Sequence, residues 1–399
     1  MRLLMYSQDG AGLGHLRRAG NIAQEVLARA PASDVLVMSD SPATPLLPAL
    51  QGLDYLKLPT IVKSGRLSSE TTSWRSSTLS LGIEQTLKLR TKLIDQTFSE
   101  FRPDVLLIDH MPLGALGELG PMLERASRCN PRPRLYLGLR DILDAPEVIR
   151  RAWDESGAYD SLRRYDGILI YGCSDMYDAA EAYDLSRHAD HLTYCNYVGP
   201  NPKTIPRVRQ SPTNGKFRSE GEHLLLVMCG GGADAFRMAE VFLQALPALT
   251  QSARIRAVIL TGPNMDPAER SALRDRPSTH PVEVLSLSDD VPSLIERASL
   301  VVTMGGYNSV CEVVDAGKKA LVVPRRGPSA EQRIRGRVFA DRGLVRAVDP
   351  DGLEPSGLAA ELVELLKSDG VPDPSAVPPL DGAQRAADIL LGSHSGRSS

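Results

Sequence analysis

The sequence is poor in cysteine, and the few cysteines it has form no recognisable pattern. Five occur among 399 residues, and none of them makes the C-x-x-C pair that supplies ligands to many zinc sites. Scattered thiols also argue against a disulfide framework and suit a reducing compartment. We therefore expect a cytoplasmic protein without a structural metal site. The cysteines are Cys129, Cys173, Cys195, Cys229 and Cys311.

Long hydrophobic runs and an excess of basic residues are missing as well. No apolar run approaches the roughly 20 residues of a membrane span. The apolar start MRLLMYSQDG is too short for a signal peptide, so we interpret it as a buried strand. The formal net charge is -3, whereas nucleic-acid-binding proteins usually present a basic face. The sequence thus predicts a globular protein with no transmembrane segment and no nucleic-acid partner.

What is present is an alternation of short β-type runs and helical patterns along almost the entire chain. This alternation predicts parallel sheets with helices on both faces. It breaks at residues 201–222, where prolines and charges are frequent, which indicates a linker. A chain of 399 residues is too long for one ordinary core. We therefore expect an α/β protein with two doubly wound, Rossmann-like domains at residues 1–200 and 223–391, a ligand cleft between them, and a disordered tail at 392–399.

The expected strands are the short apolar runs. In the first domain they are Arg2–Ser7, Val35–Ser39, Leu53–Leu58, Val105–Ile108, Leu135–Leu139 and Gly167–Tyr171, with a polar loop at Thr60–Ser77 before a long helix at Leu79–Phe101. In the second domain they are Leu224–Met228, Arg256–Thr261, Val282–Leu285, Leu300–Thr303, Ala320–Val323 and Leu344–Val348.

A glycine-rich turn, SQDGAGLGHLRR, follows the first expected strand. Gly12 and Gly14 would let the backbone approach a ligand closely, and the helix after them offers unpaired N–H groups. The dinucleotide fingerprint G-x-G-x-x-G does not fit, because His15 stands where the third glycine is required. A histidine in the first turn of a helix that faces a cleft can act as a general base. The alternative is a plain strand-to-helix turn.

A second glycine turn, MCGGGADAF, opens the second domain. Gly230, Gly231 and Gly232 precede an expected helix and suit backbone N–H contacts to a diphosphate. The turn lacks the lysine of a P-loop, so it is not one. Ordinary turn chemistry is the alternative interpretation here too.

The segment TMGGYNSVCEVVDAGKKALVVPRRGPSAEQ collects several groups that suit a nucleotide sugar. Gly306 precedes an amide and a hydroxyl, Asn308 and Ser309, at an expected helix start, where phosphate oxygens bind well. Glu312 lies one turn later and can accept both hydroxyls of a ribose. Helix capping by Asn308 or Ser309 is the alternative. A Glu-Gln pair, Glu331 and Gln332, opens another helix and could hold sugar hydroxyls.

From its glycine pair onward this segment resembles the donor-binding segment of GT-B glycosyltransferases. It is most similar to the bacterial, family 28-like relatives of MurG, which adds N-acetylglucosamine in peptidoglycan synthesis. It is also similar to the signature of plant UDP-sugar transferases, although Met304 replaces a histidine of that signature. In those enzymes an Asn-Ser pair contacts phosphate, a Glu contacts ribose, and an acidic-Gln pair contacts the sugar. The matching residues here are Asn308, Ser309, Glu312, Glu331 and Gln332.

A neighbouring stretch, LSLSDDVPSLIERASLVVT, resembles the one that contacts the base through backbone groups, which would put the base near Leu287 and Ser288. The resemblance as a whole implies a GT-B architecture, with two Rossmann-like domains facing across a cleft. It also implies an inverting, metal-independent transfer from a UDP-sugar to an acceptor hydroxyl, without a cofactor. Asp289 and Asp290 do not form a D-x-D metal motif, and we interpret them as a helix cap before Pro292.

His15 is the candidate base of this reaction. Asp109, in RPDVLLIDHMPLG, ends an expected strand of the same domain and could orient His15 as the carboxylate of a catalytic triad does. A simple loop or cap carboxylate is the alternative. His110 is less attractive, because neighbours at a strand end point to opposite sides.

Two other functions share this fold. GLGHLRR is similar to the G-x-G-H-x-x-R turn of nucleotide-sugar hydrolases in nonulosonic acid synthesis, in which the histidine activates water. A non-catalytic nucleotide-sugar-binding protein is the third option. Transfer is favoured because Thr60–Ser77 and the helix after it leave room for an acceptor. The sequence does not decide whether that acceptor is a small molecule or a lipid-linked one. LKLRTKLIDQTF would suit a peripheral membrane contact, but any helix with a buried face has the same pattern.

Overall fold

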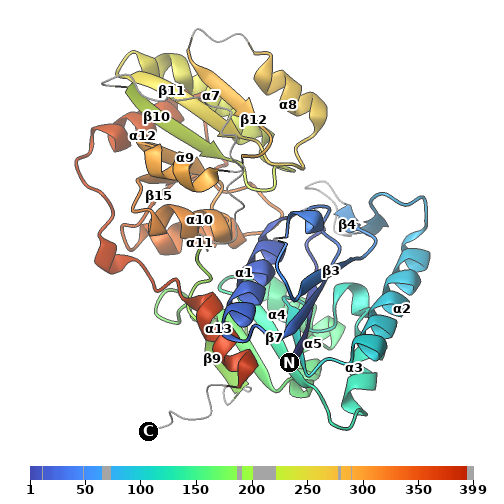
Figure 1. Cartoon of the computed structure of the whole chain (residues 1–399). Helices are drawn as coiled ribbons and strands as arrows, with labels where there is room; N and C mark the ends of the chain where they lie inside the picture. The colour runs from blue at the N-terminus through green and yellow to red at the C-terminus, as the bar shows by residue number, and fades with distance from the viewer. Residues whose placement is uncertain are drawn as a thin grey trace. The chain divides into compact units, whose positions relative to one another are not determined.

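The computed structural model describes residues 1–10, 12–47, 49–64, 73–186, 191–200, 222–276, 280–288 and 290–392. The chain forms two compact units. The first combines Met1–Val198 with Pro379–Ser399, and the second is Gly199–Pro378. Each contains a parallel sheet with helices packed against it (Figure 1), so the expected α/β class with two doubly wound sheets is confirmed.

The first unit has a seven-stranded parallel sheet within its described residues, in the order β3-β2-β1-β6-β7-β8-β9. The inner strands β1, β6, β7 and β8 are apolar runs that are buried on both faces, as parallel strands usually are, whereas the edge strands β3 and β9 are partly exposed. The order reverses between β1 and β6, so their carboxyl ends flank the point where such sheets bind ligands. The strands are β1 (Arg2–Ser7), β2 (Asp34–Ser39), β3 (Leu53–Lys57), β6 (Val105–Asp109), β7 (Arg134–Arg140), β8 (Gly167–Tyr171) and β9 (Leu192–Tyr194).

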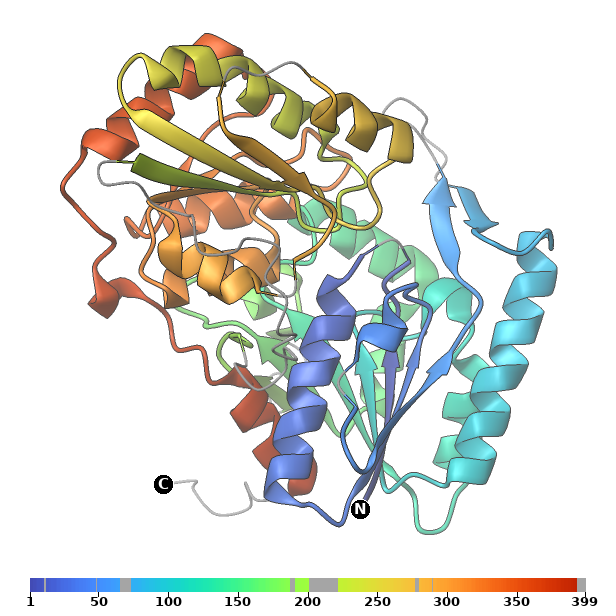
Figure 2. The same ribbon diagram turned by 45° about the horizontal axis from the view of Figure 1, so that its top comes forward.

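Helices cover this sheet. Leu4 and Tyr6 of β1 point into a core that includes Ile94 and Phe98 of α2. Two helices from opposite ends of the chain, α1 and α13, pack against each other (Figures 1 and 2). The helices of the unit are α1 (Gly14–Arg29), α2 (Ile83–Phe101), α3 (Gly120–Ser127), α4 (Pro146–Ser156), α5 (Ala158–Ser161), α6 (Ala179–Ala182) and α13 (Gly382–Leu391).

The second unit has a six-stranded parallel sheet within its described residues, in the order β12-β11-β10-β13-β14-β15. Here the order reverses between β10 and β13. The strands are β10 (Glu222–Met228), β11 (Arg254–Leu260), β12 (Val282–Leu285), β13 (Leu300–Thr303), β14 (Ala320–Val322) and β15 (Arg346–Ala347). The helices are α7 (Phe236–Thr250), α8 (Pro267–Arg274), α9 (Val291–Arg297), α10 (Tyr307–Asp315), α11 (Glu331–Ala340) and α12 (Pro355–Lys367).

Two expectations differ from the structure. The stretch Thr60–Ser77, expected to be a loop, contains two antiparallel strands, β4 (Ile61–Ser64) and β5 (Ser73–Ser76), because the buried Ile61 anchors a short β-branched run. The chain end from Pro379 was expected to belong to the second domain. It belongs to the first unit, because the Gly382 N–H donates to Tyr197 O at 2.9 Å and α13 packs on α1. Residues 201–221 of the expected linker and 393–399 of the expected tail lie outside the described residues.

Candidate functional site

The glycine turn after β1 wraps around the side chain of Asp9. The N–H groups of His15 and Leu16 donate to the Asp9 carboxylate at 3.1 and 2.6 Å. A Cβ on Gly12 would lie 2.9 Å from Asp9 Oδ1, so glycine is required beside the carboxylate. The start of α1, expected to offer unpaired N–H groups to a ligand after Gly14, therefore has two of them bonded within the chain. Burial raises the pKa of Asp9 above its ordinary value, although His15 and these donors oppose the shift.

The topology brings His15 and Asp109 together. α1 follows β1, Asp109 is the last residue of β6, and these strands are neighbours where the strand order reverses. His15 Nδ1 is hydrogen-bonded to Asp109 Oδ2. Arg18 Nη2 donates to both oxygens of the same carboxylate, at 2.7 and 2.9 Å. The two residues proposed from the sequence are thus in contact, and their catalytic roles stay predictions.

The charges around Asp109 fix its ionisation and the orientation of His15. Burial alone would raise the pKa of Asp109, but the interactions with Arg18 and His15 outweigh it and hold that pKa well below the ordinary value. His15 Nδ1 contacts both the Asp109 carboxylate, which can only accept, and Arg18 Nη2, which can only donate, the latter at 2.9 Å. A proton on Nδ1 would satisfy the carboxylate and leave the lone pair on Nε2. Arg18 is only 2% exposed and lies over the Tyr171 ring, 5.2 Å from its centroid. The imidazole is therefore held in place by the Asp109 and Arg18 side chains together.

His110 also lies against His15, and the argument that set it aside is wrong. Its φ is +69°, in the left-handed region that non-glycine residues rarely adopt. That backbone bend lets both Asp109 and His110 approach His15, and the two imidazole centroids are 5.1 Å apart. Burial and the positive charge of Arg140 hold the pKa of His110 well below its ordinary value. His110 is therefore neutral at physiological pH.

The glycine turn after β10 needs glycine for its shape. Gly230 and Gly232 have φ values of +59° and +95°, and a Cβ on Gly232 would lie 2.2 Å from Thr261 O. The carbonyl of Gly231 accepts the Asn264 N–H at 2.9 Å. The next helix, α7, begins four residues after this turn, and Ala235 at its N-cap has no side-chain acceptor.

The start of α10 lies at the other side of the same strand-order reversal, after β13. Gly306 is the N-cap and has no side chain, so Asn308 and Ser309 lie inside the first helical turn rather than capping it. No atom of the described residues lies within 4 Å of the position that a Cβ on Gly306 would occupy. Ser309 and Glu312 are 9% and 6% exposed. An amide, a hydroxyl and a carboxylate thus stand at one helix N-terminus.

Glu331 and Gln332 open α11, as expected, but both make contacts within the unit. Glu331 Oε1 accepts a hydrogen bond from Arg335 Nη1 at 2.7 Å, and that buried guanidinium also donates to Gly305 O at 3.1 Å. Gln332 Oε1 accepts the Arg325 N–H at 2.9 Å. Arg335 thus links α11 to the loop before α10, and Gln332 is bonded to the loop after β14. One oxygen of each proposed sugar ligand already has an internal partner.

The residues proposed to lie near the base occupy the loop before α9. Leu287 is 47% exposed, and Ser288 Oγ accepts the Asp290 N–H at 3.2 Å. Asp290 is the N-cap of α9, and its carboxylate accepts the Ser293 N–H at 3.3 Å. The capping interpretation is confirmed for Asp290, whereas Asp289 lies outside the described residues.

Metal ligands and membrane spans are two features that the described part of the chain does not provide. No group of three or more His, Cys, Asp and Glu side chains there could hold a metal ion. No helix within the same residues is long and apolar enough to cross a membrane.

Sequence reasoning missed Arg18, Asp9 and the contribution of His110. Arg18 had two signals: it is the last residue of the G-x-G-H-x-x-R pattern in GLGHLRR, and its i, i+3 spacing from His15 puts both side chains on one face of α1. Asp9 had no local signal, since its carboxylate reaches forward to the helix start only after the turn folds. The backbone bend at His110 depends on the end of β6 and is not encoded by its own residue type.

The fold places the chain in a known structural class. The kitacinnamycin glycotransferase superposes with a TM-score of 0.64 at 18% identity, covering 98% of both chains. MurG from Acinetobacter baumannii superposes with a TM-score of 0.57 at 14% identity, covering 98% of this chain and 99% of its own. A putative UDP-N-acetylglucosamine 2-epimerase from Listeria monocytogenes gives a TM-score of 0.60 at 14% identity, covering 98% of this chain and 94% of its own. The chain has the GT-B fold.

The second unit matches a known domain family. Residues 224–379 match the model of the glycosyltransferase family 28 C-terminal domain. The second unit is thus similar to the C-terminal domain of that family, within a chain that has the GT-B fold.

The matching curated relatives are named UDP-N-acetylglucosamine--N-acetylmuramyl-(pentapeptide) pyrophosphoryl-undecaprenol N-acetylglucosamine transferase. The protein from Prochlorococcus marinus (strain NATL2A) is 33% identical over 154 residues, which are 35% of this chain and 42% of the relative. The protein from Natranaerobius thermophilus is 23% identical over 207 residues, 47% of this chain and 56% of the relative. The chain thus spans about half the length of these relatives.

Proposed function

We propose that this protein is a glycosyltransferase that moves a sugar from a nucleotide-sugar donor, with a UDP-sugar favoured, to an acceptor hydroxyl. The observation that carries the proposal is the His15–Asp109 pair at the strand-order reversal of the first unit. It occurs in a chain whose second unit is similar to the glycosyltransferase family 28 C-terminal domain. A general base and a donor-binding domain are the two components that such a transfer needs.

In the proposed reaction His15 Nε2 takes the proton of the acceptor hydroxyl. The hydroxyl oxygen then attacks the anomeric carbon of the donor while the bond from that carbon to the diphosphate oxygen breaks. This single displacement inverts the anomeric configuration. Asp109 stabilises the imidazolium that forms, as the carboxylate of a triad does. Arg18 keeps Asp109 ionised and in place through its two hydrogen bonds.

In the second unit the donor would lie at the carboxyl ends of β10 and β13. The glycine turn Gly230–Gly232 and the start of α10, with Asn308 and Ser309, would hold the diphosphate and stabilise the charge that develops as it leaves. Glu312 would accept the ribose hydroxyls. The base would lie near Leu287 and Ser288, and Glu331 with Gln332 would contact the sugar. Because the helix start and the glycine turn can stabilise the leaving diphosphate without a cation, we propose a metal-independent reaction.

The names of the curated relatives favour particular substrates. They combine a UDP-N-acetylglucosamine donor with an undecaprenol-linked acceptor. We therefore propose UDP-N-acetylglucosamine as the first donor to test, and a lipid-linked or small-molecule acceptor.

Hydrolysis is the second candidate, because the turn GLGHLRR that carries His15 is similar to the G-x-G-H-x-x-R turn of nucleotide-sugar hydrolases. In that case His15 Nε2 would take a proton from water, and the water oxygen would attack the donor. A protein that only binds the nucleotide sugar is the third possibility.

The decisive experiment incubates the protein with radiolabelled UDP-sugars, with and without candidate acceptors, and each mixture with magnesium or with excess EDTA. Label in a second molecule indicates transfer, free sugar indicates hydrolysis, and no turnover favours a binding protein.

The variant His15→Ala should lower the rate about 10²–10⁴-fold and keep donor affinity, since a positioned general base contributes that much. The exposed His191 is the control, and His191→Ala should keep the wild-type rate. A stable His15→Ala protein with wild-type turnover would remove His15 from the mechanism.

A further inference from the structure

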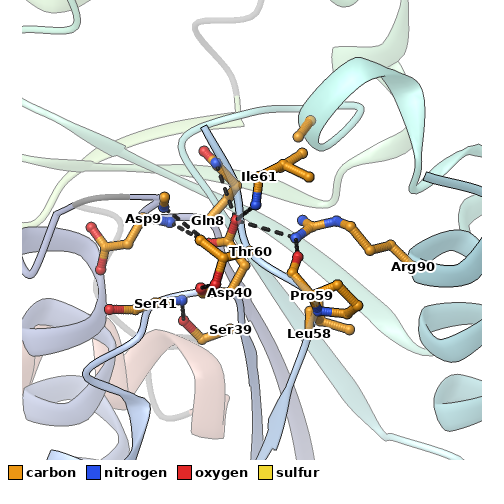
Figure 3. Close-up of polar contacts among 12 residues, drawn as sticks. Gln8, Asp9, Ser39, Asp40, Ser41, Leu58, Pro59, Thr60, Ile61 and Arg90 are labelled. Carbon is orange, nitrogen blue, oxygen red and sulfur yellow. Dashed lines mark hydrogen bonds and ion pairs between the residues drawn. The ribbon is translucent and has the colours of Figure 1, made fainter. Parts of the chain in front are cut away.

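A buried carboxylate, Asp40, holds the turn that precedes His15 (Figure 3). Asp40 follows β2 and has no exposed surface. Its Oδ1 accepts the backbone N–H groups of Asp9 and Gly10, at 2.9 and 3.0 Å. Gly10 has a φ of +55°, so the backbone at this point is in a conformation that only glycine adopts readily. The two N–H donors converge on one carboxylate oxygen, which fixes the direction in which the chain leaves β1.

Asp40 is itself held by a buried arginine from α2. Arg90 Nη1 lies 3.2 Å from Asp40 Oδ2 and donates to Pro59 O at 2.6 Å, as Figure 3 shows. On its other side Arg90 donates from Nε and Nη2 to Glu118, at 2.6 and 2.5 Å. Burying these charges is favourable only because each is paired and hydrogen-bonded. The cluster therefore gives Asp40 a fixed position within the core.

The contacts continue from Asp40 to His15. The Asp9 N–H donates to Asp40, and the Asp9 carboxylate in turn accepts the N–H groups of His15 and Leu16. Every step is a hydrogen bond between buried or half-buried groups. A shift of the Asp9 turn would move the first turn of α1 and with it the imidazole of His15, whereas Asp109 is held separately, at the end of β6.

We infer that Asp40 is a positioning residue for His15: it holds the Asp9 turn so that Nε2 of His15 stands where the acceptor proton must be taken. The inference rests on the proposed catalytic role of His15. Small displacements at a reacting centre are costly, since about 1 Å can lower a rate 10²-fold. Asp40 therefore acts on the rate through Asp9 without touching the substrate itself.

The test compares Asp40→Asn with Glu118→Gln. Asparagine keeps the size of aspartate, but its NH₂ group must face either the turn N–H groups or the Arg90 guanidinium, and all of these are donors. Glu118→Gln disturbs the same arginine but does not touch the turn, so it controls for lost stability. We expect both variants to melt at a lower temperature. Only Asp40→Asn should lower kcat, about 10–100-fold, with the KM and Kd for the donor unchanged. Equal kcat values in the two variants would overturn the inference.

A second readout does not depend on turnover. In a protein labelled with ¹⁵N-histidine, the His15 signals are identified by their loss in His15→Ala. We expect Asp40→Asn to shift them and Glu118→Gln to leave them in place. Unshifted signals in Asp40→Asn would refute positioning even in a preparation without activity, whereas shifted signals without turnover would refute only the proposed function. If Asp40→Asn does not fold, Asp9→Asn takes its place, with the same expected shift and fall in kcat.

Discussion

Asp109 is a buried carboxylate that is hydrogen-bonded to Arg18 and His15. The variant Asp109→Asn removes the carboxylate that pairs with Arg18, which is only 2% exposed. Removing one member of a buried ion pair costs about 3–5 kcal/mol. We therefore expect Asp109→Asn to lower the free energy of unfolding at pH 7 by about that amount. Asp95→Asn, which removes a carboxylate paired with the exposed Arg125, is the control and should cost about 1 kcal/mol or less.

The Asp109–Arg18 ion pair also predicts that the stability of the fold depends on pH. The folded-state pKa of Asp109 lies below its ordinary value of 3.8, so its ionised form stabilises the fold at every pH above that value. This stabilisation is lost as the pH falls below 3.8 towards the lowered pKa. The gap in melting temperature between wild type and Asp109→Asn should therefore be widest near neutral pH and shrink below about pH 4. A gap that stays constant down to about pH 3 would contradict the ion-pair interpretation.

Glu312 is the residue on which the proposed ribose contact depends. We expect Glu312→Ala to weaken UDP-sugar binding by about 1.5–3 kcal/mol, because a charge-assisted hydrogen bond is lost. Calorimetric titration measures this directly. Asp315→Ala is the control, since Asp315 is exposed and lies on the same helix. A carboxylate that binds two ribose hydroxyls should also favour UDP over dTDP, and tighter binding of dTDP would argue against this contact.

Among the elements, the turn after β10 shows how a glycine can be required by packing. A Cβ on Gly232 would lie 2.2 Å from the Thr261 carbonyl, at a φ of +95°. We expect Gly232→Ala to lower the free energy of unfolding by about 1–3 kcal/mol or more, from overpacking and backbone strain together. Urea denaturation measures the loss.

Gly357 provides the matched control in the same unit. It is exposed within α12, and no atom of the described chain lies within 4 Å of the position that its Cβ would occupy. Gly357→Ala should stabilise the unit by about 0.5–1 kcal/mol, because alanine favours the helix. The two glycine variants should therefore shift the urea midpoint in opposite directions. If Gly232→Ala were as stable as wild type, the close approach to Thr261 would not be needed.

For the whole molecule, the chain end is a structural part of the first unit. Ala383, Ala386, Ala387 and Leu390 of α13 are 5% exposed or less. Arg134 Nη2 donates to Leu390 O at 2.6 Å, and Arg29 Nε pairs with Asp388 at 2.9 Å. Burying these four side chains contributes roughly 4–5 kcal/mol to the stability of the first unit, before the entropy cost of ordering the helix is subtracted.

A chain that ends at Pro378 should therefore unfold at a lower temperature in its first unit. A chain that ends at Gly392 keeps α13 and is the control, with an expected melting temperature near that of the full protein. Differential scanning calorimetry of both truncated proteins measures their unfolding temperatures. Equal unfolding temperatures for the two truncated chains would show that α13 contributes no stability.

The sequence by itself determined the two doubly wound sheets and most of their strands, because apolar runs of strand length alternate with helical periodicity. It also placed Gly230–Gly232 and the start of α10 at the ends of strands, since glycine turns and polar helix starts are local signals. The choice of His15 and Asp109 as a pair came from chemistry, without any knowledge of their distance.

Only the tertiary structure decided the contacts that join distant segments. The strand order places β1 beside β6 and so brings His15 to Asp109, 94 residues apart in the chain. The backbone bend at His110, the cap that Asp9 gives to α1, and the Asp40–Arg90 pair all depend on neighbours far along the chain. The packing of α13 on α1 likewise joins segments that are far apart in the chain. Local propensity acts over a few residues, whereas these features form only when separate elements pack together and bury their charges.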